Sequence, residues 1–331
     1  ELDLAVGADG TSTLTVADGE VSFSNARGSV RVRAAQQSIA RPGQAPTVPA
    51  AVNVPVVIEW TNDVLPAVLL LETPFVSRDP AALAGAGAAA QGLPAGPERD
   101  LALGDVQHDR GEMPEALAAY DRAAAALPAA APAAQQARVA GRRGQALLEL
   151  GHVPEAITAF RAGIAADGGA VPPRLGLVMA LLSQRQLDDA LAEAQAAVAA
   201  APTAARAHLT LALVRIRRGE RPEAAAALQR ALALDPRSGQ AHAWQAYLLR
   251  AEDRLAAAEA EARRAVALAP RSAVAQQSLA DVLFLQGRAR EAREAARQAV
   301  RLNPLSAAAQ VALGQAELAL GNIDAAARAA H

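Results

Sequence analysis

The chain of 331 residues contains no cysteine and no lysine, and only 2% of its residues are aromatic. Without cysteine there is no thiol catalysis, no disulfide bond and no cysteine-based zinc site. Apolar residues make up 52% of the sequence, and alanine dominates them. Because an alanine side chain buries little area, an alanine-rich core requires helices whose backbones approach closely. The composition therefore favours stacked helical hairpins over a single large globular core.

A strong positive charge and a long apolar run are also missing. The formal net charge is −2, whereas proteins that bind nucleic acids or anionic membranes in general are clearly basic. The apolar run at residues 64–71 is far shorter than the about 18 residues that a membrane helix needs. We therefore predict no nucleic-acid partner and no membrane insertion by this segment. Arginine is used throughout in place of lysine, which fits recognition of carboxylates or phosphates. The codon bias of a GC-rich genome explains this preference better.

Residues 1–60 predict a meander of short antiparallel strands. Asp9-Gly10 and Asp18-Gly19 separate alternating apolar segments, which is a strong signal for β-hairpins. We expect strands near 2–6, 13–16, 21–24, 29–33 and 37–40, and an extended segment at 56–60. Residues 61–96 predict a short helix over 64–71, capped by Asp63, and then a linker rich in glycine, alanine and proline. The glycines of this linker lack the Gly-Lys-Ser/Thr of a phosphate-binding loop.

The β part resembles a known family through residues 12–16 (STLTV), 19–21 (GEV), 28–32 (GSVRV) and 42–43 (PG). Their spacing is similar to the C-terminal part of the FecR-like domain, the periplasmic β domain of ferric-citrate-type regulators. The resemblance begins within that domain, and the chain starts with Glu1 rather than Met. It implies a location in the periplasm or at the outer membrane, and we expect further protein before Glu1.

From residue 97 onward the sequence repeats with a period of 34. Equivalent alanines, prolines and glycines recur in several independent columns: Ala156, Ala190, Ala224, Ala258, Ala292 and Ala326; Pro202, Pro236, Pro270 and Pro304; Gly151, Gly219, Gly287 and Gly321. Small residues let two helices cross closely, glycine permits the turn between them, and proline ends the second helix. The copies start near residues 97, 137, 171, 205, 239, 273 and 307, with six extra residues around 129–136.

This pattern resembles the tetratricopeptide repeat. The predicted fold class is mainly α: an α-solenoid of about seven helical hairpins over residues 97–331, preceded by the small antiparallel β domain. The seventh copy stops at His331 within its expected second helix, so we expect more protein beyond it. Val178, Arg185 and Asp253 replace the usual small residues of their columns. A bulky aromatic residue in the second helix occurs only as Tyr120 and Phe160, so we expect the later copies to pack more thinly.

Catalytic or metal-binding motifs are scarce. His208 and His242 lie 34 residues apart, in equivalent positions of neighbouring copies. Stacked repeats would separate such residues by roughly 10 Å, too far to share an ion, so we interpret them as polar residues between helices. Asp188 and Asp189 suit the start of a helix, and no Gly-x-Ser-x-Gly motif is present. We predict no enzyme activity, no cofactor and no metal.

The inner surface, which the first helix of each hairpin lines in this repeat family, is the predicted partner-binding groove. One face of these helices combines arginine with aromatic side chains, the composition of protein-binding hot spots. Its residues are Arg206, Thr210, Leu213, Arg217, Trp244, Tyr247, Arg250, Ser278, Asp281 and Phe284. An alternative is that Trp244 and Tyr247 only fill the seam between repeats.

These observations lead to one preferred function and two alternatives. The preferred function is a non-catalytic interaction scaffold of the bacterial cell envelope that binds a peptide or protein. The first alternative is the soluble portion of a larger outer-membrane transport, export or filament-forming assembly protein, with self-association through the terminal repeats. The second is an enzyme whose catalytic domain lies outside this chain. Nothing in the sequence supports the second.

Overall fold

The computed structural model describes residues 2–6, 12–16, 20–25, 27–33, 36–40, 44–47, 50–51, 80–304 and 306–322. By its contacts the chain divides into two compact units. One unit comprises Leu71–Ala241, and the other comprises Glu1–Leu70 together with His242–His331.

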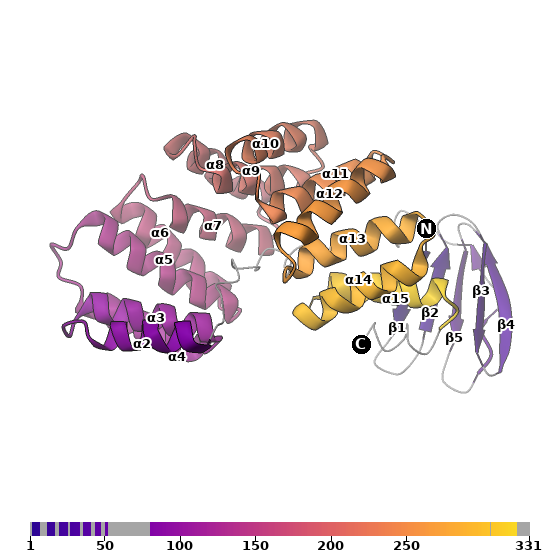
Figure 1. Ribbon diagram of the computed structural model, residues 1–331, viewed down its shortest axis with the longest axis horizontal. Helices are drawn as coiled ribbons and strands as arrows, with labels where there is room; N and C mark the ends of the chain where they lie inside the picture. Colours follow the sequence, from indigo (N-terminus) through magenta and orange to yellow (C-terminus); the bar gives the residue numbers. More distant parts are fainter. Residues whose placement is uncertain are drawn as a thin grey trace. The chain divides into compact units, whose positions relative to one another are not determined.

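The described residues contain fourteen helices, and thirteen of them form the repeat array. After a first helix, α2 (Pro80–Gln91), the first and second helices of the hairpins follow one another along the chain (Figure 1), and we call them inner and outer helices. The inner helices are α3 (Pro97–Arg110), α5 (Ala133–Glu149), α7 (Val171–Ser183), α9 (Ala205–Arg217), α11 (Gly239–Ala251), α13 (Ala273–Leu285) and α15 (Ala307–Ala319). The outer helices are α4 (Met113–Ala126), α6 (Val153–Ala166), α8 (Leu187–Ala200), α10 (Arg221–Leu234), α12 (Leu255–Leu268) and α14 (Ala289–Leu302).

Each hairpin turns sharply at a residue in the left-handed conformation. Glycine occupies this position in five copies, with φ between 76° at Gly287 and 82° at Gly151. The same conformation occurs at Arg185 (φ 57°) and Asp253 (φ 59°), the two positions where the repeat pattern lacks glycine. The turn therefore has one geometry in every copy, and at these two positions a residue with a side chain adopts it at a steric cost.

Inner and outer helices pack through small residues that face larger ones. Tyr120 lies against Gly104, and Phe160 lies against both Gly144 and Gly176. A Cβ atom at Gly144 would stand only 2.7 Å from the ring of Phe160, so the ring occupies the space that glycine leaves free. In the sixth copy the pair is small on both sides, at Ala280 and Ala296 in one buried cluster. Alanine at these sites also gives the outer helices high intrinsic stability.

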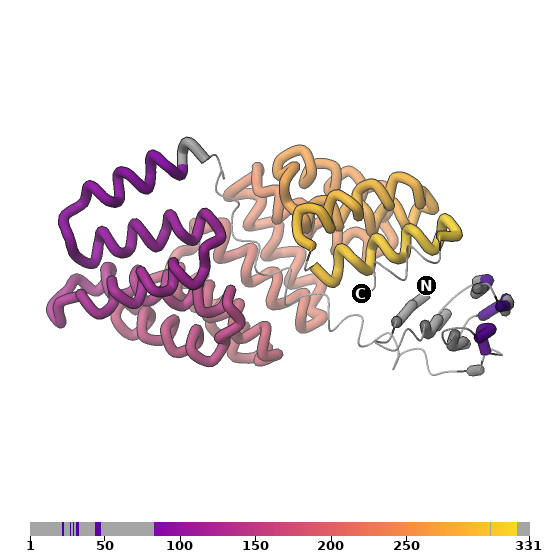
Figure 2. The backbone as a smooth tube through the Cα atoms, turned by 90° about the horizontal axis from the view of Figure 1, so that it is seen from below, coloured from indigo at the N-terminus to yellow at the C-terminus, as the bar shows by residue number. Residues whose placement is uncertain are grey.

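Successive hairpins stack within each unit. In Leu71–Ala241, α5 packs on α4, α7 on α6 and α9 on α8, while the inner helices α5 and α7 also meet. In the other unit, α13 packs on α12 and α15 on α14. Figure 2 shows the antiparallel course of these hairpins as a tube. The predicted helical solenoid is therefore present, but α5 begins at Ala133, before the predicted start of the second copy near 137.

The N-terminal strands pair in a different order from a meander. The strands are β1 (Leu2–Val6), β2 (Ser12–Val16), β3 (Glu20–Asn25), β4 (Gly28–Arg33), β5 (Gln36–Ala40) and β6 (Ala50–Ala51). One sheet has the order β1-β2-β5-β6, and β3 and β4 form a separate hairpin. All pairs are antiparallel; Leu14 of β2, for example, lies opposite Leu4 and Ser38. The predicted sequential meander is wrong, because pairing depends on non-local contacts that alternation does not specify.

The predicted linker is also wrong in part. Residues Pro80–Gln91 form α2, which packs against α3. Alanine is the strongest helix former, and its abundance here outweighs the two glycines that suggest a flexible segment. The expected extended segment at 56–60, the helix over 64–71 and the second helix of the seventh copy lie outside the described residues. Within the part of the chain that is described, every helix is too short or too polar to cross a lipid bilayer.

Candidate partner-binding surface

Four of the predicted surface residues form a continuous row on the inner helices α11 and α13. The rings of Trp244 and Tyr247 meet edge to face, with centroids 5.7 Å apart and planes at 71°. The guanidinium of Arg250 lies 5.2 Å from the centre of the Tyr247 ring, and its Nη1 lies 3.6 Å from Oδ2 of Asp281. Three-residue spacing places the first three side chains on one face of α11. The row thus combines ring edges, a cation and a carboxylate.

The acidic end of this row lies in a partly desolvated environment. Burial raises the pKa of Asp281 above its usual value, and the charge of Arg250 and a hydrogen bond from Gln277 oppose this rise only in part. Ser278, from the same helix, donates a hydrogen bond of 3.2 Å to the carbonyl oxygen of Ala243. That bond joins α13 to α11, so the two helices that carry the row are fixed to each other.

Not every predicted residue of these copies is accessible. The side chain of Trp244 is only 7% exposed, so most of it fills the space between helices, as the alternative interpretation expects. Tyr247, Arg250 and Asp281 are half-buried and keep part of their surface open. Phe284 packs against the buried cluster of Leu283, Ala292 and Ala316 and makes no ring contact with the row in the described residues.

Three buried polar atoms without a partner also occur on this pair of helices, and one of them is Oε1 of Gln245 on α11. The indole N–H of Trp244 and the side-chain carbonyl oxygen of Gln277 have no hydrogen-bond partner in the described part of the chain. Gln277 is 5% exposed. Most buried polar groups in folded proteins are paired, and an unpaired one costs about 1–3 kcal/mol. The helical pattern of the sequence could not reveal these atoms, because it does not say where a neighbouring acceptor or donor lies.

The other predicted residues lie on α9, in the unit Leu71–Ala241. Thr210 and Leu213 are 7% and 4% exposed, so, contrary to the prediction, they are buried and offer little surface to a partner. Arg217 is half-buried, whereas Arg206 is exposed. Surrounding protein atoms still desolvate the guanidinium of Arg206, and the positive charge of Arg142 lies nearby; both lower the pKa of Arg206.

Sequence reasoning missed a row of ion pairs across α3 and α5. Glu98 pairs with Arg138, and Nε of Arg142 lies 3.0 Å from Oδ1 of Asp105. At the far end, His108 Nε2 lies 3.1 Å from Oε1 of Glu149. Glu98 and Arg138 are separated by 40 residues, which is the offset between the first two copies, so aligning these copies by charge would have revealed the first pair.

The two histidines singled out by the repeat make different bonds. His208 donates through Nε2 to the carbonyl oxygen of Pro202 at 2.8 Å, and Nδ1 of His242 lies 2.6 Å from Oε2 of Glu261. Asp188 and Asp189 are in the first turn of α8, as expected. Among the described residues, no three His, Asp or Glu side chains are arranged to hold a metal ion.

The fold and this surface define a helical-repeat protein built from stacked antiparallel hairpins. The tetratricopeptide repeat model matches residues 141–205, 175–220, 209–273 and 278–330, which together exceed half of the chain. The chain therefore belongs to the tetratricopeptide repeat family, whose repeats generally mediate protein–protein interaction. All matched residues lie after residue 140, so the FecR-like resemblance of the β part stays a prediction.

Solved structures share the fold at low sequence identity. The Cut9–Hcn1 hetero-tetramer of the APC/C aligns with a TM-score of 0.61 and 18% identity, over 82% of this chain and 54% of the other. The match thus spans about half the length of the chain in the Cut9–Hcn1 structure. A tetratricopeptide repeat protein from Parabacteroides merdae aligns with a TM-score of 0.53 and 16% identity, over 70% of this chain and 90% of the other. None of the curated proteins matches this sequence.

Proposed function

We propose that this protein is a non-catalytic scaffold that binds a protein or peptide through the inner surface of α11 and α13. The observation that carries the proposal is the row of Trp244, Tyr247, Arg250 and Asp281. Aromatic and arginine side chains contribute most of the binding energy at protein interfaces, especially where they are partly desolvated. Arg250 is already oriented by Tyr247 and Asp281. The side chain of Arg250 would therefore lose little further conformational entropy when a partner binds.

The unpaired polar atoms support the same surface. An extended peptide presents carbonyl oxygens and N–H groups, which match the indole N–H of Trp244 and the carbonyl oxygen of Gln277. Because both atoms are buried, we expect a small side-chain rearrangement when the partner binds, as is common at interfaces.

The proposed location is the bacterial cell envelope, in the periplasm or at the outer membrane. It depends on the resemblance of residues 12–43 to the FecR-like domain and on no other observation. Fractionation of the source cells, followed by detection of this protein with an antibody, tests the location. Recovery with cytoplasmic markers would contradict it and would leave the proposed surface unaffected.

The surface itself is tested by comparing partners captured by matched variants. Tyr247→Ala combined with Arg250→Ala removes the accessible part of the row, and Arg263→Ala combined with Arg264→Ala changes two exposed arginines of the outer helix α12. We expect a partner captured from source lysate to be lost, by tenfold or more, with the first pair only. Circular dichroism should show unchanged helicity in both. Equal capture by both pairs would place the binding surface elsewhere.

A further inference from the structure

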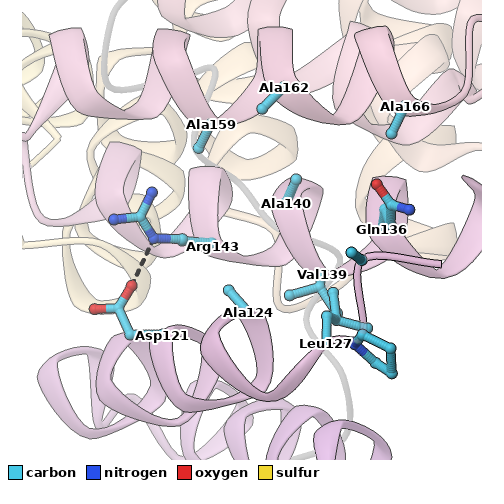
Figure 3. A pocket seen from close by; sticks show the side chains of 12 residues that line it. Asp121, Ala124, Leu127, Gln136, Val139, Ala140, Arg143, Ala159, Ala162 and Ala166 are labelled. Atoms are coloured by element: carbon cyan, nitrogen blue, oxygen red, sulfur yellow. Dashed lines mark hydrogen bonds and ion pairs between the residues drawn. The ribbon is translucent and has the colours of Figure 1, made fainter. Parts of the chain in front are cut away.

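The junction between the first two copies differs from the others on its outer side. α4 and α5 are joined by residues 127–132, a longer connection than residues 167–170 between α6 and α7. A cavity of about 520 Å³ lies beside this connection, between α4 and α6 and above α5. Figure 3 shows its alanine lining, including Ala124, Ala159 and Ala162, with the Asp121–Arg143 ion pair at one end. The extra residues thus leave space between two outer helices.

The inner side of the same junction is held largely by charge. The backbones of α3 and α5 scarcely approach each other, whereas α5 and α7 pack closely. The row Glu98–Arg138, Asp105–Arg142 and His108–Glu149 bridges this gap. The apolar contact of the first hairpin with α5 includes α4, because Tyr120 shares one buried cluster with Leu101 of α3 and Val139 of α5. Val139 of that cluster lines the cavity, and Tyr120 donates a hydrogen bond to Asp105 of the row, so the cluster connects the two sides of the junction.

The titratable pair of the row is well shielded from solvent. His108 and Glu149 are 14% and 13% exposed, and Gln145 donates a second hydrogen bond, of 2.6 Å, to the same Glu149 oxygen. Asp109 is the other carboxylate near the ring, at 3.6 Å from Nδ1. From α4, Tyr120 donates to Asp105 rather than to the pair, and α2 has no titratable side chain. In the neighbouring pair of the row, Arg142 pairs with Asp105.

The hydrogen bond to Glu149 is the main cause that raises the pKa of His108, and Asp109 adds to the rise while burial opposes it. Because the folded-state pKa lies above the unfolded value, protonation strengthens the pair. Its full contribution is present below about pH 6.5 and is lost as the pH rises through the folded-state pKa. The neighbouring, more exposed ion pairs weaken with salt instead.

We propose that the junction between the first two copies is a hinge, which the His108–Glu149 pair and its two neighbouring ion pairs hold closed on the inner side. When these pairs weaken, α3 separates from α5, the first hairpin rotates about the Tyr120–Val139 cluster, and α4 moves toward α6 across the alanine-lined cavity. Raising the pH or the ionic strength opens the inner side. The hinge and the proposed partner surface on α11 and α13 involve different residues, so either proposal can fail without the other.

The absence of cysteine makes a site-specific distance measurement direct. Glu115→Cys with Glu155→Cys places two exposed spin labels near the starts of α4 and α6, and Glu155→Cys with Asp189→Cys is the matched pair on α6 and α8. The distance between the two labels in the full chain is measured by pulsed electron–electron double resonance at about pH 6 and about pH 8.5. We expect the α4–α6 distance to shorten by a few ångström at the higher pH, and the α6–α8 distance to stay constant.

Two variants test whether the His108–Glu149 pair causes the change in the α4–α6 distance. His108→Gln keeps a hydrogen-bond donor but cannot be protonated, so it should remove the pH dependence, whereas His152→Gln should retain it. In the chain with both histidines, raising NaCl from about 0.1 M to about 1 M should shorten the α4–α6 distance as well. This second measurement does not depend on the folding of a histidine variant. Constant α4–α6 distances under both changes, or an equal change in α6–α8, would overturn the proposal.

Discussion

The contact between the inner and outer helix of a hairpin differs between two regions, the first two copies and the fifth and sixth copies. In the first two, a ring from the outer helix fills the space beside a glycine of the inner helix, as Phe160 does beside Gly144. In the sixth, alanine occupies both positions, at Ala280 and Ala296. The large aromatic side chain of the fifth copy is Trp244, on the inner helix, and it is also buried. The buried aromatic side chain therefore belongs to the outer helix in the first two copies and to the inner helix in the fifth.

This difference also separates two kinds of inner surface. Across α3 and α5, charged side chains pair with one another and bridge the helices. On α11 and α13, an aromatic row ends in a half-buried ion pair. Exposed ion pairs contribute little to stability and respond to salt, whereas partly desolvated aromatic and arginine side chains are suited to binding. The comparison teaches that one repeat can build inner surfaces of different chemistry, held by charge pairs in one place and by aromatic contacts in another.

The largest expected effect is on the aromatic–glycine core. Phe160→Ala should lower the free energy of unfolding by about 3–5 kcal/mol, because the ring is buried and touches two glycines. Gly144→Val alone should cost about 1–3 kcal/mol through overpacking. Together they reproduce the Val178–Ala194 pair of the third copy, so the double variant should be more stable than the sum of the single changes predicts. Urea unfolding of all four proteins measures this coupling. Purely additive losses would show that the two positions do not share one space.

A smaller effect, equal in both regions, is expected at the turns. Gly151→Ala and Gly287→Ala should each cost about 1–2 kcal/mol, because both glycines have φ near 80° and alanine is strained there. Asp253→Gly should instead stabilise the protein, by less than about 1 kcal/mol, since it relieves this strain but adds freedom to the unfolded chain. Thermal and urea unfolding check both. A markedly lower cost at Gly287 than at Gly151 would mean that the later copies deform at their turns.

The smallest effect concerns ion pairs between α12 and α14. A hydrogen bond from Arg288, supported by one from Arg263, lowers the pKa of Glu259 to about 2. Because this pKa is depressed, the pair stabilises the protein above about pH 4.3 and loses its effect as the pH falls toward 2. Glu259→Gln should cost about 0.5–1 kcal/mol at neutral pH and nothing near pH 2. Glu155→Gln, an exposed glutamate on α6, is the control and should have no such pH dependence.

Sequence periodicity predicted the hairpins, their turns and most helix starts, because these depend on local residue types at fixed spacing. It also located the turns at Arg185 and Asp253, and the structure shows that these residues adopt the left-handed conformation. It missed α2, because a segment of alanine and glycine is compatible with both helix and linker. It also missed the strand order, since the pairing of β2 with β5 is non-local.

The candidate surface was predicted less completely than the fold. Helical phase placed Tyr247 and Arg250 on one face, and the structure brings them together. Phase alone could not show that Trp244 is buried or that Phe284 joins another cluster, because burial depends on how closely neighbouring hairpins stack. The His108–Glu149 pair was invisible for a related reason: it arises at the one junction where the copies are offset by 40 residues rather than 34.

The central claim, that the inner face of α11 and α13 binds a protein partner, is tested most directly by photo-crosslinking in source cells. A photoreactive phenylalanine analogue replaces Tyr247 in one variant and the exposed Arg264 of the outer helix α12 in the other. The account predicts a discrete crosslinked protein, identified by mass spectrometry, from position 247 and none of that identity from position 264. The same crosslinked protein from both positions, or from position 264 alone, would contradict it.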